Sequence, residues 1–130
     1  MEDFVTYEQA LALKQLGFNE KCLFYYGPDK ILYPNYTFSA DTLRTTDLYR
    51  CCNDSSENNY PIDAPTLAQA QKWLRKNKKH SVEAQYSHDD KYDYCIKKIN
   101  GLWSDSDKEY DSYEEALSAG ITEILLSFEE

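Results

Sequence analysis

Three segments of the sequence share one pattern that marks the start of a helix: Thr6-Tyr7-Glu8-Gln9-Ala10-Leu11, Thr66-Leu67-Ala68-Gln69-Ala70 and Ser112-Tyr113-Glu114-Glu115-Ala116-Leu117. Each places a Glu or Gln three residues after a Ser or Thr, and apolar residues follow at helical spacing. In such a capping box the hydroxyl accepts a hydrogen bond from the backbone three residues on, and the Glu or Gln side chain reaches back. We therefore expect helices to begin at Thr6, Thr66 and Ser112, with strands between them.

Two glycines refine the predicted helices. Gly17 directly follows Leu16, which predicts that the first helix ends there in the left-handed conformation, with Phe18 placed for the accompanying hydrophobic contact. Gly120 lies on the apolar stripe of the third helix, whose apolar residues keep the helical spacing from 113 to 128. We expect Gly120 to let another backbone approach rather than to end the helix.

The segments between the helices have the character of strands. Residues 22–26 and 31–33 flank Gly27-Pro28-Asp29-Lys30, which is strong turn chemistry, and Pro34 cuts the second strand short. After the second helix, apolar and polar residues alternate over 82–86 and 92–96, and a third strand begins at 102. Asn100-Gly101 before it is typical of a two-residue hairpin turn.

The resulting order is α-β-β-loop-α-β-β-β-α. It predicts an α+β fold, in which three helices pack on a mainly antiparallel sheet. A chain of 130 residues is expected to form a single domain, residues 1–130. Within it, residues 34–63 lack a clear period and are expected to be irregular, with a short helical turn at 41–52 left open. A loop of this length is often functional or mobile.

Charge and hydropathy limit which classes of partner and which cellular compartment the sequence favours. The net charge is −9; residues 1–65 carry five basic and ten acidic side chains, and residues 66–130 carry nine and thirteen. Neither half is basic, so nucleic acid is not favoured as a partner unless a local basic stripe exists. The acidic start Met1-Glu2-Asp3-Phe4 and the lack of a long apolar run predict neither signal peptide nor membrane span. We expect a cytoplasmic protein with reduced cysteines.

Residues suited to metal or cofactor chemistry do not form a recognisable pattern. The two His and four Cys show no zinc spacing. Carboxylates alternate over 105–111 as at the start of a calcium loop, but Tyr110 stands where the turn needs Gly and Ala116 where the loop needs Glu. There is no glycine-rich phosphate loop and no nucleophile elbow. We predict no catalytic residue, no cofactor and no metal, while a Cys–His or Ser–His pair stays open.

Two clusters are candidates for binding. The aromatic residues of the first hairpin and of the residues after it are candidate protein contacts, because exposed tyrosines are good contact anchors. The basic end of the second helix is a candidate phosphate contact, although it also suits a solvated helix end facing the acidic run 105–115. The candidate protein contacts are Tyr25, Tyr26, Tyr33, Tyr36 and Phe38, and the candidate phosphate contacts are Lys72, Arg75, Lys76, Lys78 and Lys79.

Two resemblances follow from these patterns. From Val82 to Gly120, three strands and a helix that opens with residues 110–116 resemble the DNA-binding domains of plant ethylene-response factors and of phage integrase arms. Those domains read DNA with Arg and Lys on the sheet. The equivalent strands here carry Glu83, Gln85, Asp93 and Lys97. The resemblance therefore implies a shared topology and not that activity.

Over its whole length the chain resembles a group of small, acidic, uncharacterised proteins of gut anaerobic bacteria, often encoded near prophage or conjugative elements. Residues 4–10, 64–74 and 110–117 carry this resemblance, which implies the fold described above and a bacterial setting.

Three functional hypotheses remain. The first is a non-enzymatic, cytosolic protein-interaction module of mobile-element type, which binds another protein or itself through the hairpin 22–38 and the loop 39–63. The alternative is a nucleic-acid-binding accessory protein that uses the basic end of the second helix. The third is a small enzyme with a cleft lined by Cys51, Cys52 or His88.

Overall fold

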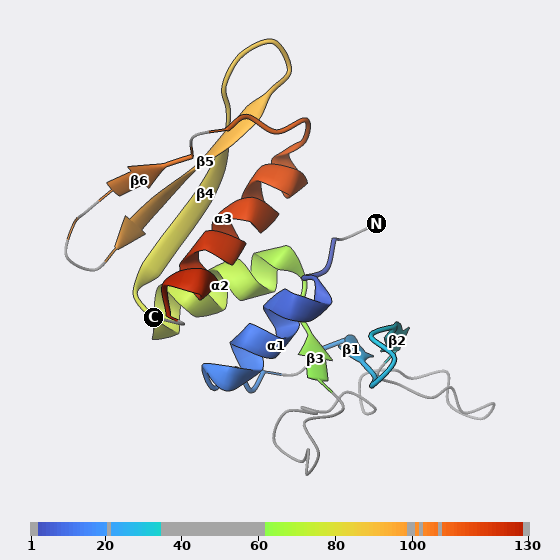
Figure 1. Cartoon of the computed structure of the whole chain (residues 1–130). Helices are drawn as coiled ribbons and strands as arrows, with labels where there is room; N and C mark the ends of the chain where they lie inside the picture. Colours follow the sequence, from blue (N-terminus) through green and yellow to red (C-terminus); the bar gives the residue numbers. More distant parts are fainter. Residues whose placement is uncertain are drawn as a thin grey trace, which may run out of the picture. The chain divides into compact units, whose positions relative to one another are not determined.

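The computed structural model describes residues 3–20, 22–34, 62–98, 101, 103–106 and 108–128. The α+β class is confirmed, but the strands form two three-stranded antiparallel sheets, β2-β1-β3 and β4-β5-β6, instead of one. Figure 1 shows the elements in chain order: α1 (Tyr7–Gln15), β1 (Phe24–Tyr26), β2 (Leu32–Pro34), β3 (Ile62–Ala64), α2 (Leu67–Asn77), β4 (His80–Tyr86), β5 (Tyr92–Lys98), β6 (Trp103–Asp105) and α3 (Tyr113–Ser127).

The chain divides into two compact units. Unit 1 comprises Met1–Asp3 and Thr66–Glu130, and unit 2 comprises Phe4–Pro65. The expectation of a single domain stays a prediction. The predicted bounds of the irregular segment 34–63 were wrong at both ends, because Pro34 belongs to β2 and residues 62–63 belong to β3. The helical turn expected at 41–52 lies outside the described residues.

The three predicted helix starts are confirmed. In α1 the reciprocal bond of the capping box is also made, because the Thr6 N–H donates to Gln9 Oε1 at 2.8 Å. In every helix the capping hydroxyl accepts from the backbone N–H three residues on, at 3.1–3.2 Å: Thr6 from Gln9, Thr66 from Gln69 and Ser112 from Glu115.

The end of α1 also follows the prediction. Gly17 has φ +100°, its N–H donates to the Lys14 carbonyl at 3.0 Å, and the Phe18 N–H donates to the Leu13 carbonyl at 3.0 Å. This pair of bonds is the Schellman motif. Phe18 and Leu13 are both buried, as expected for the hydrophobic contact that accompanies the motif.

In unit 2, β1 lies between β2 and β3. Tyr25 pairs with Tyr33 on one side and with Asp63 on the other. Because side chains alternate along a strand, Phe24 and Tyr26 point to the opposite face from Tyr25. The Phe24 ring packs edge-on against Phe4 with centroids 4.8 Å apart, so this face of β1 meets the segment before α1.

In unit 1, helices cover one face of the sheet. α3 packs on β4 and β5, and α2 packs on β4 and beside α3 (Figure 1). The covered face carries the buried side chains of Val82, Tyr94 and Ile96. A Cβ atom at Gly120 would lie 2.5 Å from Val82 Cγ2 and 3.1 Å from the Tyr94 ring. A close approach is present at Gly120, but side chains of the sheet make it, so the expectation that another backbone approaches there was wrong.

The register of β5 and β6 differs from the one that the predicted turn would give, although Asn100 itself lies outside the described residues. A two-residue turn at Asn100-Gly101 would place Trp103 opposite Lys98, whereas Trp103 pairs with Lys97. Gly101 has φ +84° and its N–H donates to the Lys98 carbonyl at 2.9 Å. A shift of one residue moves a side chain to the other face of a sheet. Trp103 therefore shares the face of Lys97, opposite to the helices.

Candidate interaction surfaces

The hairpin β1–β2 provides the first candidate surface. The rings of Tyr25 and Tyr33 stack with centroids 5.9 Å apart, and Ile31 and Tyr33 are 54% and 37% exposed. The Tyr33 hydroxyl donates to Asp29, and this hydrogen bond lowers the pKa of Asp29 and raises the pKa of Tyr33. Ile31 and Tyr33 thus give the hairpin an exposed apolar surface.

The other candidate hairpin contacts are not part of this surface. Tyr26 faces the other side, where its hydroxyl donates to the Val5 carbonyl at 2.7 Å and its ring meets Tyr7. Partial burial, with a smaller contribution from Glu8, raises the pKa of Tyr26. Its contacts hold β1 against the segment before α1. Tyr36 and Phe38 lie outside the described residues.

The basic end of α2 is the second candidate surface. Lys72, Arg75 and Lys76 are exposed and share one face of the helix. Lys78 and Lys79 follow the helix, and the Lys78 ammonium lies 5.8 Å from the centroid of the Trp73 ring. Among the described residues, none of these five cations makes an ion pair, so the predicted contact with the acidic run 105–115 is not found.

The outer face of the sheet β4-β5-β6 is a third surface, which the sequence did not reveal. Trp103 is 66% exposed, and the Lys97 ammonium lies 4.1 Å from the centroid of its ring. Lys97 is attracted to the π-face of the indole and supports it from one side. No described helix of unit 1 covers this face. Its side chains are Ser81, Glu83, Gln85, Asp93, Cys95, Lys97, Trp103 and Asp105.

The charge on this outer face is mainly negative. Glu83 and Asp105 flank Cys95 from the neighbouring strands, and Asp93 adds a third carboxylate against the single ammonium of Lys97. Partial burial, followed by the hydrogen bond to Asp105, raises the pKa of the Cys95 thiol. Asp93 Oδ1 is buried without a hydrogen-bond partner among the described residues. The face therefore offers acceptors and negative charge around an exposed indole.

A small pocket opens on the other side of β6. It has a volume of about 80 Å³ and lies between the ends of β5 and β6 and the last turns of α3. Ile96 and Ile124 are buried, and Glu123 accepts a hydrogen bond from the Tyr94 hydroxyl. The pocket combines an apolar floor with a polar rim. Its lining residues are Ile96, Lys98, Ser104, Glu123, Ile124 and Ser127.

The two edges of this sheet differ. At β4, the Gln71 side chain donates to the Val82 carbonyl at 2.6 Å, so α2 satisfies a backbone acceptor of that edge. At β6, the Ser106 N–H donates to the Tyr94 carbonyl at 3.0 Å. Because backbone groups alternate in direction along an antiparallel strand, those of Trp103 and Asp105 point away from β5. Within the described part of the chain, no hydrogen bond occupies them.

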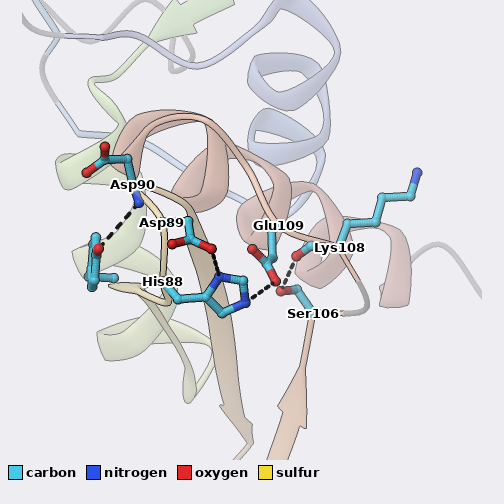
Figure 2. Close-up of polar contacts among 7 residues, drawn as sticks. His88, Asp89, Asp90, Ser106, Lys108 and Glu109 are labelled. Atoms are coloured by element: carbon cyan, nitrogen blue, oxygen red, sulfur yellow. Dashed lines mark hydrogen bonds and ion pairs between the residues drawn. The ribbon is translucent and has the colours of Figure 1, made fainter.

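After β6 the chain leaves the ladder and returns. Tyr110 pairs with Tyr92, whereas the register of β6 would place Lys108 there. The pairing therefore shifts by two residues, as at a bulge, and Glu109 lies towards the β4–β5 turn (Figure 2). In this turn Asp89 and Asp90 both have positive φ, and the Lys91 N–H donates to the His88 carbonyl at 2.8 Å.

His88 joins the turn to the bulge. Its Nε2 lies 3.0 Å from Glu109 Oε1 and its Nδ1 lies 3.4 Å from Asp89 Oδ2 (Figure 2). A base that activates a nucleophile needs one ring nitrogen directed at that group, whereas both nitrogens of His88 face carboxylates. The Ser106 hydroxyl donates to the Lys108 carbonyl at 2.9 Å. The cluster therefore resembles an exposed ion pair more than a catalytic dyad. Cys51 and Cys52 lie outside the described residues.

The described residues contain no group of three or more His, Cys, Asp or Glu side chains arranged to hold a metal ion. None of the described helices has the length and apolar character needed to span a membrane. Comparison with models of protein families, with curated proteins and with solved structures finds no match to this chain.

Proposed function

We propose that the protein is a non-enzymatic protein-interaction module, and that the outer face of the sheet β4-β5-β6 is its main contact surface. The observation that carries the proposal is the exposed Trp103 on a sheet whose described helices pack on one face. Tryptophan is enriched among the residues that dominate binding energy at protein interfaces. The exposed Ile31 and Tyr33 of the hairpin form a second contact surface in this proposal.

The setting in this proposal is the cytoplasm of a bacterium that carries mobile elements. It rests on the resemblance to proteins of gut anaerobes and on the acidic, largely polar sequence, with net charge −9. The partner is another protein rather than a second copy, because two outer faces with three carboxylates each would repel one another.

Site-specific photo-crosslinking tests the proposal. A benzoylphenylalanine in place of Trp103 is expected to capture a protein in host cells. The matched control carries the same group in place of Tyr113, which is 42% exposed at the start of α3. Capture of the same protein from both positions, or of nothing from position 103, would contradict the proposal. Light scattering at low and high salt is expected to show a monomer.

A second candidate function is nucleic-acid binding through the basic end of α2. It is favoured by the five cations that make no ion pair within the described residues. Binding of this kind weakens steeply with salt because counterions are released from the phosphates. A gel shift of a DNA duplex at low salt, repeated with the double variant Arg75→Gln and Lys76→Gln, tests it. Absence of any shift at low salt would end this candidate.

A further inference from the structure

We infer that the edge of β6 that faces away from β5 binds an extended segment of a partner protein, and that the segment carries a small apolar residue between two cationic ones. The inference rests on the proposed function and names the partner's chemistry. It combines three observations on one short strand: backbone groups that point outward, an acidic face with an exposed indole, and a pocket on the opposite face.

The backbone sets the geometry of the complex. The N–H and C=O groups of Trp103 and Asp105 point away from β5, so a strand paired antiparallel to β6 would form hydrogen bonds with these two residues. Strand addition of this kind takes affinity from main-chain hydrogen bonds and specificity from alternate side chains. The residue opposite Ser104 would direct its own backbone groups away from β6.

The side-chain pattern of the segment follows from the two faces. Residues opposite Trp103 and Asp105 would lie on the outer face, and the residue opposite Ser104 would lie on the face of the pocket. An Arg beside Trp103 can stack on the indole, and a Lys beside Asp105 would form a cross-strand ion pair. The carboxylates of Glu83 on β4 and Asp93 on β5 lie farther from the segment and, against the single ammonium of Lys97, leave this face with a net negative charge.

The pocket limits the size of the central residue. Its volume of about 80 Å³ is roughly half that of a cavity of ~150 Å³ that holds benzene. Val fits such a space better than an aromatic residue, and Ile96 and Ile124 provide its apolar contacts. The preferred segment is therefore Lys-Val-Arg, with Lys opposite Asp105 and Arg opposite Trp103.

Charge also argues against a second copy of the chain as the occupant. Antiparallel pairing of two β6 strands would bring two acidic outer faces into one continuous sheet, and each protein carries a net charge of −9. A partner with a basic segment gains attraction from the same carboxylates.

Peptide titration of the full chain tests the inference. The probe is the peptide Thr-Lys-Val-Arg-Thr with blocked ends, and the readout is the amide spectrum of the ¹⁵N-labelled protein. We expect saturable shifts at Trp103, Ser104 and Asp105. N-methylation of the Lys or Arg of the peptide should weaken binding at least about tenfold, because each loses a ladder hydrogen bond and clashes with the edge, whereas N-methylation of Val should be tolerated. Equal binding of all three N-methylated peptides would overturn strand addition.

Protein variants test the role of charge. Asp105→Asn should weaken binding of the Lys-Val-Arg peptide by up to about fivefold, the upper end for an opposite-charge cross-strand pair. The matched control Asp90→Asn removes the same charge from the β4–β5 turn and should bind as the wild type does. Equal losses in both variants, or equal binding of Thr-Glu-Val-Glu-Thr, would refute the charge pattern.

The two proposals can fail separately. Photo-crosslinking at position 103 captures a partner whatever its chemistry, so capture there together with no binding of the Lys-Val-Arg peptide would overturn this inference and leave the proposed function standing. A dimer in light scattering that the peptide does not dissociate would instead identify a second copy as the occupant and overturn the inference.

Discussion

Replacing Gly120 by alanine should destabilise unit 1, although alanine is the better helix former. The exchange gains up to about 1 kcal/mol of helix propensity. The new Cβ would lie 2.5 Å from Val82 Cγ2 and 3.1 Å from the Tyr94 ring, which is closer than van der Waals contact allows. Val82 is fully buried and its branched side chain has little rotamer freedom, so α3 must move. Overpacking of this kind costs about 1–3 kcal/mol, so after the helix-propensity gain we expect a net loss of up to about 2 kcal/mol.

Urea unfolding followed by circular dichroism measures this difference. The matched background is Val82→Ala, which removes the atom that a Cβ at position 120 would meet. In that background the cost of Gly120→Ala should fall by at least about 1 kcal/mol, because the stability effects of substitutions at contacting residues are not additive. If Gly120→Ala alone raised the free energy of unfolding by the amount that helix propensity predicts, the close approach of α3 to the sheet would be refuted.

Three further predictions concern turns and charges. Gly17→Ala should cost about 1 kcal/mol in thermal or urea unfolding, because alanine is strained at φ +100°. Asp90→Val should cost about 1 kcal/mol, whereas Asp90→Asn should change stability by less than about 0.5 kcal/mol, because Asn tolerates a positive φ. Lys91 donates to Asp111 and lowers the pKa of that carboxyl. A carboxyl whose pKa is lower in the folded state stabilises the fold at every pH above its unfolded-state pKa. Asp111→Asn should therefore destabilise the protein near neutral pH. The difference in stability between this variant and the wild type should vanish as the pH falls through the native pKa of Asp111. An equal difference at every pH would contradict this linkage.

Local signals in the sequence predicted the helices well. The caps at Thr6, Thr66 and Ser112 and the stop at Gly17 depend on residues within a few positions of one another, so their chemistry is legible without the rest of the chain. The strand β3 was missed for the opposite reason. Its three residues are all buried and so show no alternation, and they form a strand because they pair with β1, far away in the sequence.

The contact surface was harder to predict than the fold. Alternation along β1 separates Tyr25 from Tyr26, but the sequence does not say which face is covered. The exposure of Trp103 depends on a single step of register, and the Asn100-Gly101 signal favoured the other register. The pocket beside Ser104 exists only when β5, β6 and α3 are assembled. Sites made by tertiary packing leave no local pattern.

The hydrogen bond from Gln71 to the Val82 carbonyl has a consequence for stoichiometry. A sheet that could accept strands at both edges could join one molecule to the next without end, as in fibres. Here a side chain of the protein's own α2 obstructs one edge, so growth is directed to the other. Each molecule would then take up one strand and stop, which favours a closed one-to-one complex over a polymer.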